Sequence, residues 1–210
     1  MELLLNHIVY KHHPSLVLGF HACEQEIGEE LLKGTKGFKA SENGFDWLGS
    51  GMYFWENSPS RAEAYGIELK DKRKKLKEPM VIGAVIHLGK CFDLLESHCL
   101  EVLQAHYISL KKLYLIANKP MPTNETAFIG DSDKLYRKLD CAVIEYMHSE
   151  IANQKGTPFD ATRGAFWEGK DLYPGAGFKE KNHIQLCIRN PNCIKGYFRP
   201  LESDYKYPDV

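Results

Sequence analysis

The chain has 210 residues, of which 43% are hydrophobic and 26% are charged, and its formal net charge is -1. This length and composition are typical of a globular protein with one core, so we expect a single domain over residues 1–210. The near-neutral charge argues against a global basic field for nucleic acid, although a local basic groove stays compatible with it.

The spacing of the cysteines and the lengths of the apolar runs indicate the cellular compartment of the protein. No CxxC spacing occurs among the six cysteines, which argues against zinc fingers and redox dithiols. His12 and His13 have no carboxylate at ligand spacing, so we expect no metal. No signal peptide is visible, and no apolar run approaches the ~18 residues of a membrane span. We therefore expect a cytoplasmic protein with no membrane partner.

The first half of the chain predicts alternating strands and helices. Gly34 follows the first helical pattern as a C-cap, and Ser58 and Pro59 provide an N-cap and a first helical residue for the second. The predicted elements are strand 16–21, helix 24–32, loop 35–51, an aromatic strand containing Tyr53, and helix 58–75.

The second half predicts two helices between strands. Residues 131–133 resemble a helix cap, and the aromatic residues of the long loop indicate order rather than disorder. The predicted elements are strands 80–88 and 91–94, helices 96–117 and 134–151, loop 157–181, and strands 183–188 and 194–198. The regular strand–helix alternation of a doubly wound sheet is missing, so we predict an α+β fold.

The segment from Leu48 to Glu56 contains the most informative pattern. Gly49 and Gly51 allow a sharp turn and a close approach of the backbone to a ligand. Tyr53 follows on a short strand, and a helix begins directly after that strand. A glycine turn, an aromatic strand and a helix are the parts needed to hold a flat heterocycle.

Together with an upstream strand, this segment resembles the NAD-binding core of ADP-ribosyltransferases, in the poly(ADP-ribose) polymerase and diphtheria-toxin branch. The resemblance covers residues 16–66. It is carried by Gly19-Phe20-His21-Ala22-Cys23, by Gly51-Met52-Tyr53-Phe54 and by Ser60-Arg61-Ala62-Glu63-Ala64-Tyr65. It implies an ADP-ribosyltransferase-like split antiparallel β-sandwich core with surrounding helices.

The resemblance also implies roles for the matching residues. His21 would hydrogen-bond the adenosine-side ribose, and Tyr53 and Tyr65 would close the two faces of the nicotinamide ring. The backbone of Ala22 would bind the carboxamide, where the family has glycine. Cys23 replaces the family's Ser or Thr, which removes one hydroxyl hydrogen bond worth ~1 kcal/mol. Tyr65 has a second interpretation, as a helix residue that packs on the sheet.

A third group must orient the ribose and stabilise the positive charge that develops when the nicotinamide–ribose bond breaks. The family uses a Glu on a late strand. Alternation along residues 183–188 favours Gln185 at this position, with His183 and Cys187 on the same face. Gln185 supplies no negative charge, and Glu168 and Glu180 are the nearby acidic candidates.

Further residues are assigned with an ordinary alternative beside each. Arg163 in the long loop could pair with a pyrophosphate or form a structural ion pair. Ser41 could contact NAD or serve as a turn serine, and Trp167 could stack on a substrate base. The basic run 70–77 is a solvated helix end by default and a nucleic-acid backbone contact by the minority interpretation.

The resulting hypothesis is a mono-ADP-ribosyltransferase that uses NAD as its substrate. It releases nicotinamide and transfers ADP-ribose to a protein or a nucleic acid. A bacterial toxin or phage-defence effector, with an antitoxin or immunity protein as partner, fits by analogy only. The rival hypotheses are an NAD glycohydrolase, an RNA 2′-phosphotransferase, for which the extra His and Arg residues are missing, and a catalytically weak module that binds NAD or ADP-ribose.

Overall fold

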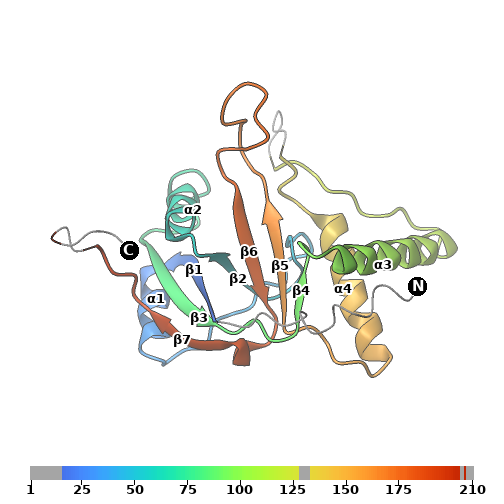
Figure 1. Ribbon diagram of the computed structural model, residues 1–210, viewed down its shortest axis with the longest axis horizontal. Coiled ribbons are helices and arrows are strands. Elements are labelled where there is room, and N and C mark those ends of the chain that lie inside the picture. Colours follow the sequence, from blue (N-terminus) through green and yellow to red (C-terminus); the bar gives the residue numbers. More distant parts are fainter. Residues whose placement is uncertain (1–15, 128–132, 204–205, 207–210) are drawn as a thin grey trace.

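The computed structural model describes residues 16–127, 133–203 and 206, and Figure 1 shows its elements. The predicted cap residues Asp131 and Ser132, and His12 and His13, lie outside these residues. The strands are β1 (Val17–Glu24), β2 (Met52–Glu56), β3 (Pro79–Ile86), β4 (Cys91–Asp93), β5 (Ala161–Phe166), β6 (His183–Ile188) and β7 (Ile194–Phe198). The α-helices are α1 (Gln25–Leu32), α2 (Pro59–Asp71), α3 (Ser97–Ile116) and α4 (Lys138–Asn153).

The seven strands form one mixed sheet in the order β4-β5-β6-β2-β1-β3-β7. All neighbours are antiparallel except β4 and β5, which run parallel. A cluster of buried apolar residues from β2, β3 and β6, including Phe54, Ile86 and Leu186, forms the main core. The prediction of an α+β fold is therefore confirmed.

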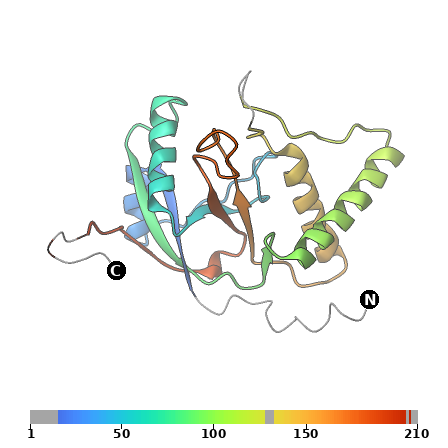
Figure 2. The same ribbon diagram turned by 45° about the horizontal axis from the view of Figure 1, so that its top comes forward.

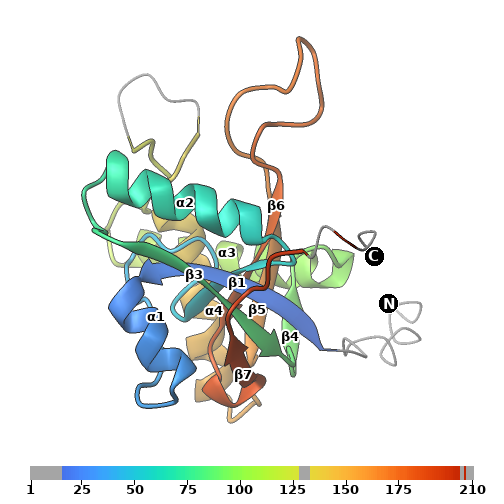
Figure 3. The same ribbon diagram turned by 90° about the vertical axis from the view of Figure 1, so that its left-hand side faces the viewer.

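The helices lie at the two ends of the sheet. Helices α1 and α2 pack on β1 and β3, whereas α3 and α4 pack on each other near β4 and β5 (Figures 1 and 2). Strands β5 and β6 lie between these groups, and their connection, residues 167–182, projects beyond the sheet (Figure 3). We call this connection the arm.

Two elements differ from the prediction for tertiary reasons. The predicted loop 157–181 contains β5, whose small residues and Gly164 give little β signal, yet β5 pairs with a strand on each side. Helix α4 begins at Lys138 instead of residue 134. The preceding residues are extended, because Tyr136 bridges to Glu125 and the carbonyl of Leu135 accepts a hydrogen bond from Trp47 Nε1 at 2.8 Å.

Candidate active site

A cavity of about 770 Å³ opens beside β2, bordered by α2, the segment 41–47 and the arm. We call it the main cavity. Seven of the predicted site residues line it, and they come from distant parts of the sequence: His21, Ser41, Tyr53, Tyr65, Glu168, Glu180 and Gln185. The fold therefore brings together most of the residues that the sequence pattern selected.

The floor of the main cavity is the turn and strand that contain Tyr53. Gly49 has φ +81°, a left-handed conformation that favours glycine. At Gly51 a Cβ atom would lie 2.8 Å from the carbonyl oxygen of Ile188, so only glycine lets β6 approach this closely. The Tyr53 hydroxyl donates to the Gly49 carbonyl at 2.5 Å and accepts from the Leu48 amide at 2.9 Å. These contacts fix the tyrosine ring at the cavity.

An ion pair behind the floor holds the turn in place. Glu145 on α4 accepts hydrogen bonds from the Ser50 amide and from Arg189 Nη1, each at 2.6 Å. Arg189 also donates to the Ser50 carbonyl at 2.9 Å. Burial tends to raise the pKa of Glu145, but the hydrogen bonds from Arg189 and Ser50 outweigh it and lower that pKa.

The sheet opens between β1 and β2 next to this floor. Strand β1 pairs with β3 over eight residues, but with β2 only at Gly19–Glu56 and Phe20–Trp55. In this register the next two positions would join His21 to Phe54 and Ala22 to Tyr53. There the Tyr53 carbonyl instead accepts a hydrogen bond from His21 Nδ1 at 2.8 Å. His21 therefore lies where the two strands separate.

The protonation state of His21 follows from its surroundings. Burial lowers the pKa of His21 to about 4, against a smaller opposing effect of the hydrogen bond to Tyr53. A carbonyl oxygen can only accept, so Nδ1 carries the proton of the neutral ring. Nε2 is then an acceptor, which suits a hydroxyl group.

The backbone of Ala22 and the side chain of Cys23, the two residues after His21, point in different directions. The Leu18 carbonyl accepts from Asn57, on the β2 side of the strand. Backbone groups alternate along a strand, so the N–H and C=O of Ala22 point to the same side, into the opening between β1 and β2. The Cys23 side chain is buried with Leu31 and Ile82 and does not line the main cavity, so a contact of this side chain with a ligand there is not supported.

Aromatic and cationic side chains of β2 and α2 line the main cavity beside Tyr53. The rings of Trp55 and Tyr65 pack with centroids 5.0 Å apart, and the Arg61 guanidinium lies 5.4 Å from the Trp55 ring. Trp55 Nε1 and Arg61 Nε are buried without a hydrogen-bond partner among the described residues. Tyr65 packs on the sheet, as its second interpretation predicted, and it also lines the main cavity.

The candidates for the third catalytic position come from β6 and from the arm. Gln185 is half-buried and is paired with Trp55 across the β2–β6 ladder. Glu168 is buried at the base of the arm, where its carboxylate is 3.3 Å from Arg61 Nη2 and 3.6 Å from His183 Nε2. Burial raises the pKa of Glu168, and Arg61 and Lys181 offset only part of this effect. Glu180 accepts from the Lys170 amide at 3.2 Å.

Arg163 does not reach the main cavity, contrary to the pyrophosphate prediction. It follows the register of β5 opposite Leu186, so its side chain faces away from that of Gln185. It binds Glu56 at 2.6 Å and Asp93 at 3.0 Å. The structural ion-pair alternative is the one observed.

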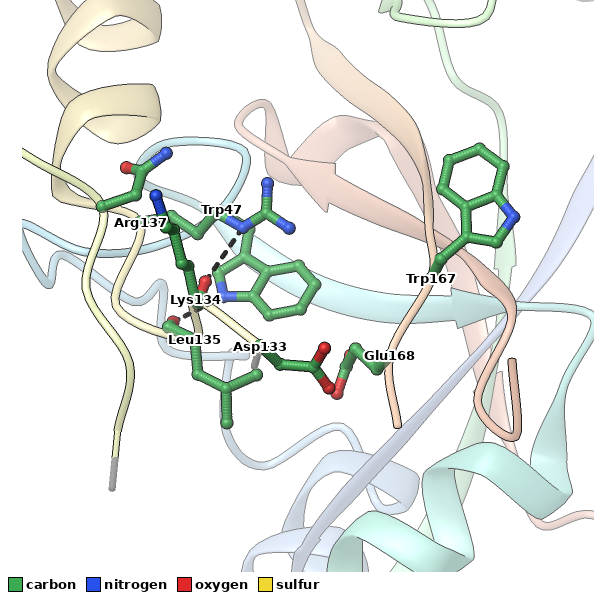
Figure 4. Close-up of a pocket in the computed structure, with 8 residues that line it drawn as sticks. Trp47, Asp133, Lys134, Leu135, Arg137, Trp167 and Glu168 are labelled. Carbon is green, nitrogen blue, oxygen red and sulfur yellow. Dashed lines mark hydrogen bonds between the residues drawn. The ribbon is translucent and has the colours of Figure 1, made fainter. Parts of the chain in front are cut away.

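A second, smaller pocket of about 250 Å³ adjoins the main cavity and shares Trp47, Asp133, Leu135 and Glu168 with it. In Figure 4 the carboxylates of Asp133 and Glu168 point toward each other, while the Trp167 indole lies apart from them. Arg137 covers the Trp47 ring with its guanidinium 4.6 Å from the ring centroid. The Gly169 amide donates a hydrogen bond to Asp133 at 2.6 Å, which ties the base of the arm to the segment that precedes α4.

The sequence analysis assigned no role in the site to Trp55, Arg61, Glu145 or Arg189. Trp55 and Arg61 lie within the segment that resembles the family, and their periodicity relative to Tyr53 and Tyr65 was the available signal. Glu145 and Arg189 are remote from that segment, and nothing in a single sequence connects them to Ser50.

Among the described residues, no three His, Cys, Asp or Glu side chains are grouped to hold a metal ion. In the same residues, no helix combines the length and the apolar character that a membrane span requires. No family model and no solved structure matches the chain. The chain is 25% identical, over 195 residues, to an uncharacterized protein of Methanocaldococcus jannaschii, and the match covers 84% of this chain and 83% of that protein.

Proposed function

We propose that the chain is a mono-ADP-ribosyltransferase with an ADP-ribosyltransferase-like domain that uses NAD as its substrate. The carrying observation is that His21, Tyr53, Tyr65 and Gln185, from three strands and one helix, line a single cavity. These are the positions that the family resemblance assigns to NAD. The opening between β1 and β2 supports the finer fold proposal, a split antiparallel β-sandwich.

The opening next to His21 fits the nicotinamide end of the dinucleotide. The Ala22 N–H and C=O point into the opening and match the acceptor and donor of a carboxamide. Tyr53 offers an aromatic face at the floor, and Tyr65 offers another from α2. The neutral His21 ring presents Nε2 as an acceptor for a hydroxyl of the adenosine-side ribose.

The unpartnered donors of Trp55 and Arg61 fit the charged part of the substrate. Trp55 Nε1 and Arg61 Nε belong to residues that line the main cavity, and both are buried without a partner among the described residues. Buried donors of this kind favour a ligand that brings oxygen acceptors. We assign to Arg61, in place of Arg163, the contact with the diphosphate.

Bound NAD supplies a ribose–nicotinamide bond that breaks with its electron pair on nicotinamide, while a lone pair of the acceptor forms the new bond. Gln185, next to the floor, orients the ribose through its amide. Glu168 provides the carboxylate that Gln185 lacks. It takes up the acceptor's proton, which is favoured because burial raises the pKa of Glu168.

The test measures NAD binding by calorimetry and nicotinamide release by chromatography, together with transfer of label from NAD to total protein and total RNA. We expect all three signals in the wild type and their loss in Tyr53→Ala. Gln185→Ala, which removes a half-buried side chain, serves as a second variant if Tyr53→Ala unfolds. Tyr107→Ala on α3, outside the cavity, is the matched control.

Each outcome separates the proposal from its rivals. Nicotinamide release without label transfer indicates an NAD glycohydrolase. Binding without release indicates a module that only binds the dinucleotide. Absence of both NAD binding and nicotinamide release contradicts the proposal.

A further inference from the structure

We call the end of α2 and the arm, where they border the main cavity, the mouth of the cavity. The mouth carries cations that the proposed NAD chemistry does not use. Lys72 and Lys75, at the end of α2, and Lys170, on the arm, are exposed and line the cavity. Their ammonium groups make no hydrogen bond or ion pair among the described residues. By contrast, Arg73 and Lys181 at the same mouth are paired with Glu68, at 2.9 and 3.5 Å.

The free cations lie on both sides of the mouth. The end of α2 forms one side and the arm the other, and the Lys181–Glu68 and Arg61–Glu168 ion pairs join the two. Figure 3 shows α2 and the arm near the same end of the molecule. Since the chain as a whole carries a net charge of -1, this concentration of free positive charge is local.

The arm, which carries Lys170, also carries exposed aromatic side chains. Trp167 is 55% exposed, Tyr173 56% and Phe178 60%. The arm itself is ordered by its own hydrogen bonds, since the Leu172 amide donates to the Phe178 carbonyl at 3.0 Å and the Glu180 amide donates to the Lys170 carbonyl at 3.0 Å. The rings are thus presented to solvent on a formed hairpin.

We propose that the acceptor of the ADP-ribose is a single-stranded nucleic acid, held by its phosphates on Lys72, Lys75 and Lys170 and by its bases on the rings of the arm. Phosphate contacts require cations without a protein partner, and stacking requires aromatic faces open to solvent. A duplex hides the faces of its bases, so a single strand fits the arm better. This inference rests on the proposed transferase function.

The transfer step joins the two sites at the cavity mouth. The bond between nicotinamide and ribose breaks, and its electron pair leaves with nicotinamide. A nitrogen or oxygen lone pair of the nucleic acid forms the new bond to the ribose carbon. The proton of that nitrogen or oxygen passes to a cavity carboxylate, for which Glu168, at the base of the arm and in the lining of the cavity, is available.

The first experiment needs no NAD. Fluorescence anisotropy measures the binding of labelled RNA and DNA strands of about 20 nucleotides, as single strands and as duplexes, over a range of salt concentrations. We expect tighter binding of the single strands. Lys72→Gln/Lys75→Gln should weaken binding and reduce the salt slope by about 1.4, because each lost phosphate contact on a single strand lowers it by about 0.7.

Two comparisons make the result specific. Trp167→Ala should weaken single-strand binding about tenfold and leave the salt slope unchanged, since it removes stacking but no charge. Lys111→Gln/Lys112→Gln on α3 removes the same charge from two exposed lysines outside the cavity and should change neither quantity. Equal effects of the two double variants, or no single-strand binding at all, overturn the inference.

A second experiment separates this inference from the proposed function. NAD labelled in its adenylate phosphate is incubated with the wild type, single-stranded oligonucleotides and a protein extract. Label on the oligonucleotide supports the inference, whereas label only on protein overturns it and leaves the transferase function intact. If nicotinamide is not released and NAD does not bind, the proposed function fails, and the anisotropy result alone decides whether the mouth binds nucleic acid.

Discussion

The floor and the mouth of the main cavity are built on different principles. The floor, residues 48–55, is held by a glycine at a close contact, by the Tyr53 hydroxyl and by the Glu145–Arg189 ion pair. The mouth, formed by the end of α2 and the arm, consists of exposed lysines and rings. The floor therefore tolerates little change, whereas the mouth can vary without affecting the fold. In the proposed function, the floor holds NAD and the mouth selects the acceptor.

The largest effect is expected from Gly51→Ala, which tests the rigidity of the floor. The added Cβ would lie 2.8 Å from the Ile188 carbonyl oxygen and 2.5 Å from Cys187 Sγ, so β2 and β6 must separate. We expect a loss of roughly 2–3 kcal/mol in the free energy of unfolding, measured by urea denaturation. Gly37→Ala is the control, because nothing lies within 4 Å of its Cβ position. Equal stability of the two variants would remove the basis for a tightly packed floor.

A smaller loss is expected from Tyr53→Phe, which keeps the ring and removes the hydroxyl. The Leu48 amide and the Gly49 carbonyl lose their hydrogen bonds to this group. We expect a destabilisation of about 1–2 kcal/mol in the same urea experiment. NAD binding, as proposed, should persist because the aromatic face remains. Loss of binding without loss of stability would show that the hydroxyl itself contacts the ligand.

The ion pair behind the floor predicts a pH dependence. The pKa of Glu145 is lowered in the folded state, so its contribution to stability is present above the unfolded pKa of about 4.3 and is lost as pH falls through the folded value. Glu145→Gln should cost about 1 kcal/mol at neutral pH, with partial exposure limiting the effect. The stability difference between variant and wild type should shrink in acid. A difference that stays constant down to pH values of about 3 contradicts this account.

The smallest effect on stability is expected at the mouth. Lys72→Gln/Lys75→Gln changes two exposed side chains without ion pairs among the described residues, so the free energy of unfolding should stay within about 0.5 kcal/mol of the wild type. Urea denaturation beside the nucleic-acid binding assay checks this directly. A large destabilisation would mean that the lysines belong to the structural part of the cavity, and the contrast between floor and mouth would disappear.

Several parts of the fold were predictable because their signals are local. The apolar and aromatic runs of β1, β2, β3, β6 and β7 and the helical periodicity of α1–α4 identified these elements to within a few residues. Strand β5 was missed, since its stability comes from β4 and β6 and not from its own sequence. The start of α4 was misplaced because Trp47, far away in the chain, holds the Leu135 carbonyl.

The candidate site also contains residues that the sequence predicted correctly and one that it did not. The resemblance to ADP-ribosyltransferases grouped His21, Tyr53 and Tyr65, and strand alternation selected Gln185. All four line the main cavity. The same reasoning put Arg163 into the site, although the side chain is neutralised by Glu56 and Asp93 on the other face of the sheet. The glycine-rich sequence around Arg163 does not indicate its ion-pair partners, because these lie on strands remote in the sequence.

By itself, the sequence determined the α+β class and most element positions, because periodicity and turn chemistry act over short distances along the chain. The residues of the proposed NAD site came from the resemblance to a known family. Only the tertiary structure decided that β1 and β2 separate at His21, that Arg61 and not Arg163 borders the cavity, and that Glu145 and Arg189 support the floor. These features depend on contacts between residues distant in sequence, and packing and burial select such contacts after the local elements have formed.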